Sequence, residues 1–213
     1  MYNILVFGAI GTLGKSLIDH ALNNKKIKTV RALIGKDTRK LKSFNLEKAV
    51  VDFNNENEIA QAMQNIDYVF LCMGSNYSKD EYTDDELDYF LPLKIAKIAK
   101  QAGIKSIIMV NTPFADASSN NIYIKNRGLL QQAIIDLKFF STSVLQANHI
   151  KKSKSADTFL RVIGSNLLNL ITAGEWHKRR AINVNYVSRA MIKAALKNAE
   201  GVEIYSPHTI KVM

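Results

Sequence analysis

Six short apolar runs alternate with stretches of helical periodicity, and this alternation constrains the fold more than any other feature of the chain. The runs are rich in Val, Ile and Phe, and most are nearly continuous rather than alternating with polar residues. Continuous runs are typical of strands covered on both faces, as in a parallel sheet. The expected strands are Tyr2–Phe7, Thr29–Ile34, Lys48–Phe53, Tyr68–Met73, Ser106–Val110 and Ser141–Leu145.

The segments between these runs have the spacing of amphipathic helices. Leu13, Leu17 and Ala21 repeat every four residues after the first run. Thr83 and Glu86 have the spacing of a capping box, which predicts a helix that starts just before Leu87. Strands that alternate with such helices form βαβ units, so we expect an α/β fold with a Rossmann-type, doubly wound parallel sheet.

The C-terminal third is less regular than the rest of the chain. We expect helices over Asp157–Ile171 and Tyr186–Lys197, and a final strand over Val202–Tyr205. The chain has no linker rich in Gly, Pro or Ser and no internal repeat. It is therefore expected to form one domain, residues 1–213, with substrate or partner elements in its C-terminal third.

Composition excludes several classes of protein. With 213 residues, 47% hydrophobic and 23% charged, the chain can bury a core and is not disordered. Its one cysteine allows no intrachain disulfide, and the four scattered histidines have no ligand spacing, so we expect no metal site. No apolar run approaches the ~18–20 residues of a membrane span, and the N-terminus leads directly into a strand. We expect a cytoplasmic protein that makes no membrane contact.

The net charge of +10 requires a test of the nucleic-acid interpretation. Residues 25–48 carry nine Lys and Arg against two carboxylates. However, aromatic residues that could stack on bases do not alternate with these cations, and no nucleic-acid-binding motif is present. Solvated lysine-rich faces explain the charge, and we do not expect a nucleic-acid partner.

A glycine loop follows the first expected strand directly. Gly8 allows the tight turn from strand to helix, Gly11 lets the backbone approach a pyrophosphate, and Gly14 allows the helix to pack closely on the sheet. The next helix turn, which begins at Thr12 and Leu13, offers free N–H groups and the positive end of the helix dipole to phosphates. Three glycines in this context predict a dinucleotide site.

The spacing G-x-x-G-x-x-G resembles that of atypical short-chain dehydrogenase/reductases, and other segments extend the resemblance to their NmrA-like NAD(P)H-binding branch. Val30–Ile34 and Val69–Gly74 are similar to its second and fourth strands. Segments 118–123 and 137–144 resemble the proteins of this branch that are like the Tat-interactive oxidoreductases. The resemblance implies that Asp52 and Phe53 flank the adenine and that Gly74 passes the cofactor.

The choice between NADP and NAD depends on the loop after the second strand. A cation in this loop suits the extra phosphate of NADP, whereas an acid binds the ribose hydroxyls of NAD. Lys36 and Arg39 favour NADP, with Arg31 nearby on the strand, and Asp37 is the counter-evidence. We expect NADP as the cofactor, with NAD as the alternative.

The resemblance also implies catalytic positions, with departures from the family pattern. The family uses a Tyr, a Lys four residues later and a Ser at the end of the fifth strand for proton exchange with a carbonyl or alcohol. Here Tyr123 is kept, Arg127 replaces the Lys, and Asn111-Thr112 stands where relatives carry Ser. Tyr123, Arg127 and Thr112 are the candidate catalytic residues, although Arg is not a neutral replacement for Lys.

Two classes of function remain open. The first is an NAD(P)H-dependent reductase of a small carbonyl, quinone or flavin, in which hydride transfer to a flavin or quinone would need no tyrosine. The second is a non-catalytic protein that senses NAD(P) and binds a protein partner, which the altered Lys and Ser positions would suit. A homodimer is a further option that the sequence leaves open.

Overall fold

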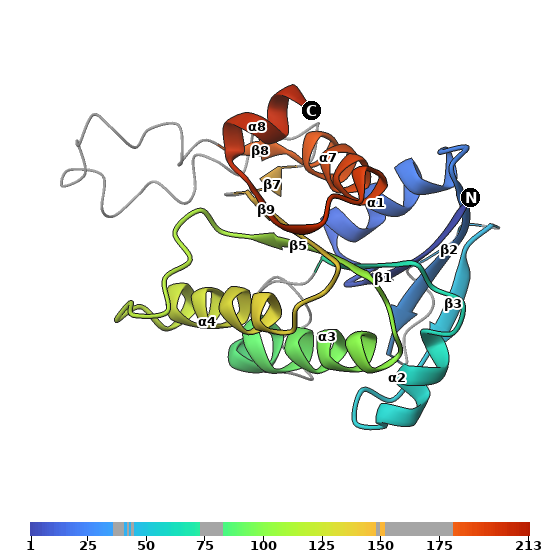
Figure 1. The fold of residues 1–213 in the computed structure, drawn as a ribbon, viewed down its shortest axis with the longest axis horizontal. Helices are drawn as coiled ribbons and strands as arrows, with labels where there is room; N and C mark the ends of the chain where they lie inside the picture. The colour runs from blue at the N-terminus through green and yellow to red at the C-terminus, as the bar shows by residue number, and fades with distance from the viewer. Residues whose placement is uncertain (36–40, 42, 44, 73–82, 148–149, 152–180) are drawn as a thin grey trace.

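A seven-stranded sheet, in which every pairing is parallel, forms the centre of the molecule (Figure 1). The computed structural model describes residues 1–35, 41, 43, 45–72, 83–147, 150–151 and 181–213. The strands are β1 (Tyr2–Phe7), β2 (Ile27–Ile34), β3 (Glu47–Val50), β4 (Tyr68–Leu71), β5 (Ser106–Asn111), β6 (Ser141–Gln146) and β9 (Gly201–Tyr205). Two short strands, β7 (Ile150–Lys151) and β8 (Ile182–Asn183), pair separately.

The strand order is β3-β2-β1-β4-β5-β6-β9, which confirms the expected Rossmann-type topology. The chain first moves outward from β1 to β3 and then returns to build the other half from β4 onward. The order therefore reverses between β1 and β4. In open parallel sheets, ligands bind outside the carboxyl ends of the strands at such a reversal.

Helices cover both faces of the sheet (Figure 1). One layer consists of α1 (Thr12–Leu22), α7 (Val184–Lys197) and α8 (Pro207–Val212); the other consists of α2 (Glu56–Ala62), α3 (Leu91–Gln101) and α4 (Ile122–Asp136). Each face has its own apolar cluster because successive strand residues point to opposite sides. Within the described ranges, no helix is both long enough and apolar enough to cross a membrane.

The structure differs from the expected elements mainly at their ends. β3 stops at Val50 and β4 at Leu71, so Asp52 and Phe53 lie in the turn after β3 rather than in a strand. Helix α7 begins at Val184, two residues before the start predicted at Tyr186. The predicted helix over 157–171 lies outside the described residues.

The predicted capping box is confirmed. The backbone N–H and the hydroxyl of Thr83 donate to Glu86 Oε2 at 2.7 and 2.9 Å, and the N–H of Glu86 donates to Thr83 Oγ1 at 3.3 Å. These bonds satisfy N–H groups that the start of a helix would otherwise leave without a partner. They also hold the carboxyl of Glu86 in its charged form, because hydrogen bonds from Thr83 lower its pKa.

Candidate functional site

The glycine loop joins β1 to α1 at the point where the strand order reverses. Gly8 has a φ of +83°, a backbone conformation that residues with a Cβ rarely adopt. Gly11 is the N-cap of α1, and its N–H donates to the carbonyl of Gly8 at 3.1 Å. A Cβ on Gly14 would lie 2.2 Å from the carbonyl oxygen of Gly8. Gly8 and Gly14 thus have the turn and close-packing roles that the spacing predicted, and the approach of Gly11 to a pyrophosphate stays a prediction.

The start of α1 is suited to an anion. It carries no acidic residue in its first turn and no side chain that caps it. Thr12 is exposed, whereas Leu13 is buried in the core, so the loop presents its first-turn N–H groups at the surface while the helix is anchored below. A Cβ on Gly11 would approach the Gly8 carbonyl to 3.3 Å, so its absence leaves the loop open. The residues present fit a dinucleotide pyrophosphate.

Phe53 follows β3 and lies beside the glycine loop in the fold. Its ring is 5% exposed and meets the ring of Phe7, the last residue of β1, with centroids 5.5 Å apart. Gly35, which follows β2, leaves room for the same ring, since a Cβ there would lie 3.5 Å from it. Asp52 is exposed, and its carboxylate accepts from the N–H of Asn54 at 2.9 Å. These groups therefore lie next to one another at the carboxyl ends of β1, β2 and β3.

Arg31 is confirmed as a strand residue and lies away from this edge. Its guanidinium forms an ion pair with Glu47 at 2.8 Å and donates to the carbonyls of Ala62 and Gln64 at 2.8 and 2.9 Å. These contacts tie β2 to β3 and α2, so Arg31 is not placed to hold a ribose phosphate. Four other predicted cofactor positions lie outside the described residues: Lys36, Asp37, Arg39 and Gly74.

The candidate catalytic residues lie directly after β5 and in the first two turns of α4. Asn111 is the last residue of β5, and Thr112 directly after it is 5% exposed. The Thr112 hydroxyl accepts from the N–H of Phe114 at 3.3 Å. Tyr123 lies in the first turn of α4 and is 40% exposed, so its ring is accessible from the surface.

Arg127 lies one turn beyond Tyr123 but is buried and bonded to the end of β5. Its Nε donates to Asn111 Oδ1 at 2.9 Å and its Nη2 donates to the carbonyl of Val110. Asn111 Nδ2 in turn donates to the carbonyl of Arg127 at 3.1 Å and to Gln131 Oε1 at 2.8 Å. This network fastens α4 to β5, a role for Arg127 that the sequence did not predict.

Opposing charges act on the Tyr123 hydroxyl. Burial raises its pKa, the guanidinium of Arg127 lowers it, and the carboxylate of Asp88 raises it, with a net increase. The hydroxyl is therefore protonated at neutral pH. Burial lowers the pKa of Arg127, whereas the charges of Tyr123 and Asp88 raise it, with a net decrease.

Sequence reasoning missed the residues that hold this end of the site together. The sequence marks Asn111 only as a departure from the family's Ser, and it does not single out Asp88. At Gly128, α4 also packs closely on the loop after β5, because a Cβ there would lie 2.3 Å from the backbone nitrogen of Ala117. The glycine directly after Arg127 was the one signal in the sequence that could have indicated this close approach.

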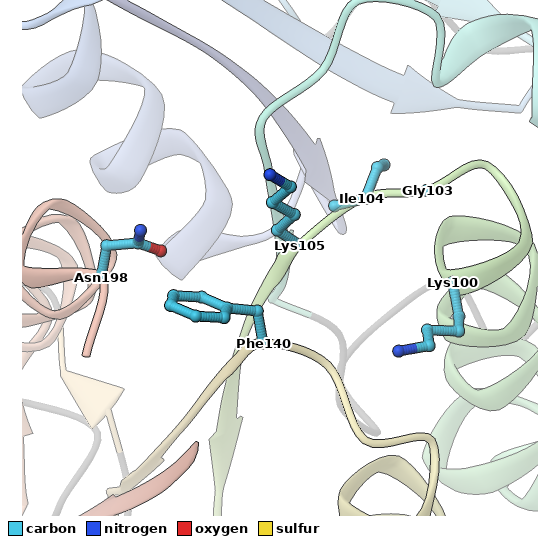
Figure 2. A pocket seen from close by; sticks show the side chains of 6 residues that line it. All are labelled: Lys100, Gly103, Ile104, Lys105, Phe140 and Asn198. Carbon is cyan, nitrogen blue, oxygen red and sulfur yellow. The ribbon is translucent and has the colours of Figure 1, made fainter. Parts of the chain in front are cut away.

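A pocket of about 430 Å³ lies at the amino ends of β5 and β6, opposite the carboxyl ends where the glycine loop lies (Figure 2). None of the predicted site residues lines this pocket, so it is separate from the candidate dinucleotide site. The Lys100 ammonium in it donates to the carbonyl of Lys138 at 2.5 Å and lies 5.4 Å from the centre of the Phe139 ring. The lining residues are Lys100, Gly103, Ile104, Lys105, Phe140 and Asn198.

Solved structures share the fold over almost the whole chain. MoeE5 in complex with UDP-glucose and NAD aligns with a TM-score of 0.70 and 18% identity, over 96% of this chain and 75% of that one. The Bordetella bronchiseptica enzyme WbmH in complex with NAD+ aligns with a TM-score of 0.68 and 14% identity, over 96% and 75%. At such identities the likeness concerns the fold.

Sequence relatives extend over nearly the full length as well. Protein HTATIP2 of Rattus norvegicus is 29% identical over 212 residues, which cover 93% of this chain and 83% of that protein. The mitochondrial protein FMP52 of Candida albicans is 26% identical over 207 residues, which cover 92% and 89%. A family model described as NAD(P)H-binding matches residues 8–195, from the first glycine of the loop into α7. The chain therefore belongs to this NAD(P)H-binding family, within the atypical short-chain dehydrogenase/reductases.

Proposed function

We propose that the chain is an NAD(P)H-dependent reductase of a small carbonyl, quinone or flavin, with NADPH as its preferred cofactor. The observation that carries the proposal is the glycine loop, where Gly11 caps α1 without a side chain and Gly14 lets α1 pack directly on the loop backbone. The loop binds the pyrophosphate through backbone N–H groups of the first turn of α1. Lys36 and Arg39 are proposed to bind the ribose phosphate, and Asp52, Phe53 and Gly74 to lie along the cofactor.

The chemistry needs one hydride and one proton. The bound nicotinamide supplies the hydride, which forms a C–H bond at the substrate carbonyl carbon. Tyr123 donates its hydroxyl proton to the substrate oxygen and regains a proton from solvent. The hydroxyl of Thr112 is proposed to hydrogen-bond the same oxygen, and Arg127 to stabilise the tyrosinate that forms briefly.

The first test is calorimetric titration of the purified protein with NADPH, NADH and their oxidised forms. We expect micromolar binding, with NADPH about tenfold tighter than NADH, a difference of about 1.4 kcal/mol. Gly11→Asp is the control for the loop, because its carboxylate would occupy the phosphate position, and it should abolish binding. Replacing both Lys36 and Arg39 by Ser should remove the preference and leave NADH binding unchanged. Absence of binding by the wild-type protein would refute the proposal.

The tyrosine is tested by Tyr123→Phe. We expect turnover to fall on the order of 10²–10⁴-fold, since the proton donor is lost, while NADPH affinity stays unchanged. The measurement is NADPH oxidation with a panel of small ketones, aldehydes, quinones and riboflavin. Turnover that survives this substitution would exclude the tyrosine relay and favour direct hydride transfer to a flavin or quinone.

A non-catalytic NAD(P)-sensing function is the second candidate. The observation that favours it is the Arg127 network, in which two guanidinium nitrogens are bonded to Asn111 and Val110 rather than left for a ribose. This function predicts cofactor binding with no turnover on any member of the panel. A protein partner would then recognise the nucleotide-bound form.

A further inference from the structure

The side-chain amide of Asn111 forms hydrogen bonds through both its oxygen and its nitrogen. Its Oδ1 accepts from the Arg127 Nε–H and the Thr112 backbone N–H, both at 2.9 Å. Its Nδ2 donates to the Arg127 carbonyl at 3.1 Å and to Gln131 Oε1 at 2.8 Å. An amide has two acceptor positions and two N–H donors, so these four bonds use its full capacity. Asn111 is 1% exposed and contacts two of the three candidate catalytic residues.

These bonds require an arginine at position 127. The guanidinium is held along one edge, because Nε donates to Asn111 and Nη2 donates to the carbonyl of Val110. Arg127 is 3% exposed, and a charge this deeply buried needs such bonds to offset the loss of its hydration. In a lysine the atom at the place of Nε is a methylene carbon, which cannot donate to Asn111 Oδ1.

The guanidinium in turn requires an asparagine at position 111. A serine there would offer one hydroxyl in place of an amide, and its oxygen would lie one bond closer to the backbone than Asn111 Oδ1. The buried Nε–H of Arg127 would then lose its acceptor, which costs the full desolvation of that group. The Asn and the Arg, which stand where the family pattern has Ser and Lys, therefore depend on each other.

Thr112 is held by the same network. Its N–H donates to Asn111 Oδ1, and its hydroxyl accepts from the N–H of Phe114 at 3.3 Å. Asn111 therefore links the hydroxyl-bearing residue after β5 to the cation on α4. Gly128 brings α4 close enough for this link, since α4 packs there against the backbone of the loop after β5.

We propose that Asn111 is a positioning residue, and that it forms with Arg127 a matched pair that fixes a cation and the Thr112 hydroxyl at the end of β5. The two departures from the family pattern are accordingly one coupled change. The site keeps a hydroxyl and a positive charge within one helical turn of Tyr123. The inference rests on the proposed reductase function only for the reaction that these groups serve.

The first test uses the wild-type protein and follows its arginine Nε–H groups by NMR. A buried, bonded N–H exchanges slowly with water. We expect the Nε–H of Arg127 to exchange at least about tenfold more slowly than that of Arg189, which is exposed on α7 and is the internal control. Equal exchange rates would overturn the inference, and this result needs no variant to fold.

The second test is a double-mutant cycle of Asn111→Ser and Arg127→Lys, followed by thermal unfolding. Each single substitution should lower Tm by roughly 6–12 °C, and the double variant should lose clearly less than the sum. A single variant that does not fold while the double variant does would show the same coupling. Additive losses would overturn the matched pair. Gln131→Ala should lower Tm, whereas Gln132→Ala, its exposed neighbour on α4, should leave Tm within about 2 °C.

Kinetics separates a positioning role from a structural one. Below its Tm, Asn111→Ser should lower kcat for NADPH oxidation about tenfold and leave KM for NADPH unchanged, because the glycine loop lies on other elements. Adding Arg127→Lys should restore part of kcat. An unchanged kcat in Asn111→Ser would overturn the positioning role. If the wild-type protein turns over no substrate, the reductase proposal falls, whereas slow exchange and a non-additive cycle would still support the matched pair.

Discussion

Gly14→Ala should weaken cofactor binding and lower the stability of the protein at the same time. The new Cβ would lie 2.2 Å from the Gly8 carbonyl oxygen and 2.8 Å from the Ala9 Cα, both backbone atoms that cannot swing away. Alanine is favoured over glycine in a helix by about 1 kcal/mol, which is too small to offset such a clash. We expect a loss of about 3 kcal/mol in the free energy of unfolding, or roughly 6–12 °C in Tm.

The same displacement moves the N-terminus of α1 away from the glycine loop. NADPH affinity should therefore fall at least about tenfold even below the melting temperature. Thermal unfolding and calorimetric titration measure the two effects. Gly35→Ala is the control for stability, because its Cβ would make an ordinary 3.5 Å contact with the Phe53 ring. A Gly14→Ala protein with wild-type Tm would show that α1 does not pack on the loop as described.

Gly128→Ala should have a comparable effect at the other end of the site. Its Cβ would lie 2.3 Å from the Ala117 backbone nitrogen and 2.4 Å from the Asp116 carbonyl carbon. Either α4 or the loop after β5 must move, and α4 carries both Tyr123 and Arg127. We expect a loss of about 2–3 kcal/mol in the free energy of unfolding after the helix-propensity gain of about 1 kcal/mol is subtracted.

This substitution separates the two halves of the site. Since the glycine loop lies on β1 and α1, NADPH binding should weaken far less than turnover, and the two are measured by calorimetry and by NADPH oxidation. Lys125→Ala is the matched control on α4, because that side chain is exposed and its loss should leave the free energy of unfolding within about 0.5 kcal/mol. Equal stability of Gly128→Ala and Lys125→Ala would contradict the close packing at position 128.

The central strands β1, β4, β5 and β6 were predictable because they are covered on both faces, unlike the more exposed edge strands β3 and β9. Burial on both sides requires apolar residues at successive positions, and this requirement appears directly as continuous runs such as Ile4–Phe7. Their ends were less predictable. Phe53 is as apolar and buried as a strand residue, but its burial comes from packing against Phe7 and not from strand pairing. Hydropathy alone does not distinguish these two causes of burial.

Arg127 illustrates the corresponding limit at the site. Its spacing from Tyr123 placed both residues on one face of a helix, and the structure confirms that both lie in α4, one turn apart. The spacing said nothing of Asn111, sixteen residues earlier, whose side chain holds the guanidinium against β5. The spacing of residues along a helix predicts which of them share a face. It does not predict which strand or loop that face contacts.

The sequence by itself determined the parallel sheet, the helix start at Thr83 and the glycine loop, because each depends on residues near one another in the chain: apolar runs, a capping box and three spaced glycines. Only the tertiary structure decided that Arg127 is buried and bonded to β5 and that Asp88 is buried within a π-helix. These features depend on charges and hydrogen bonds between elements far apart in the sequence. Their energies depend on burial and distance, which exist only once the chain has folded.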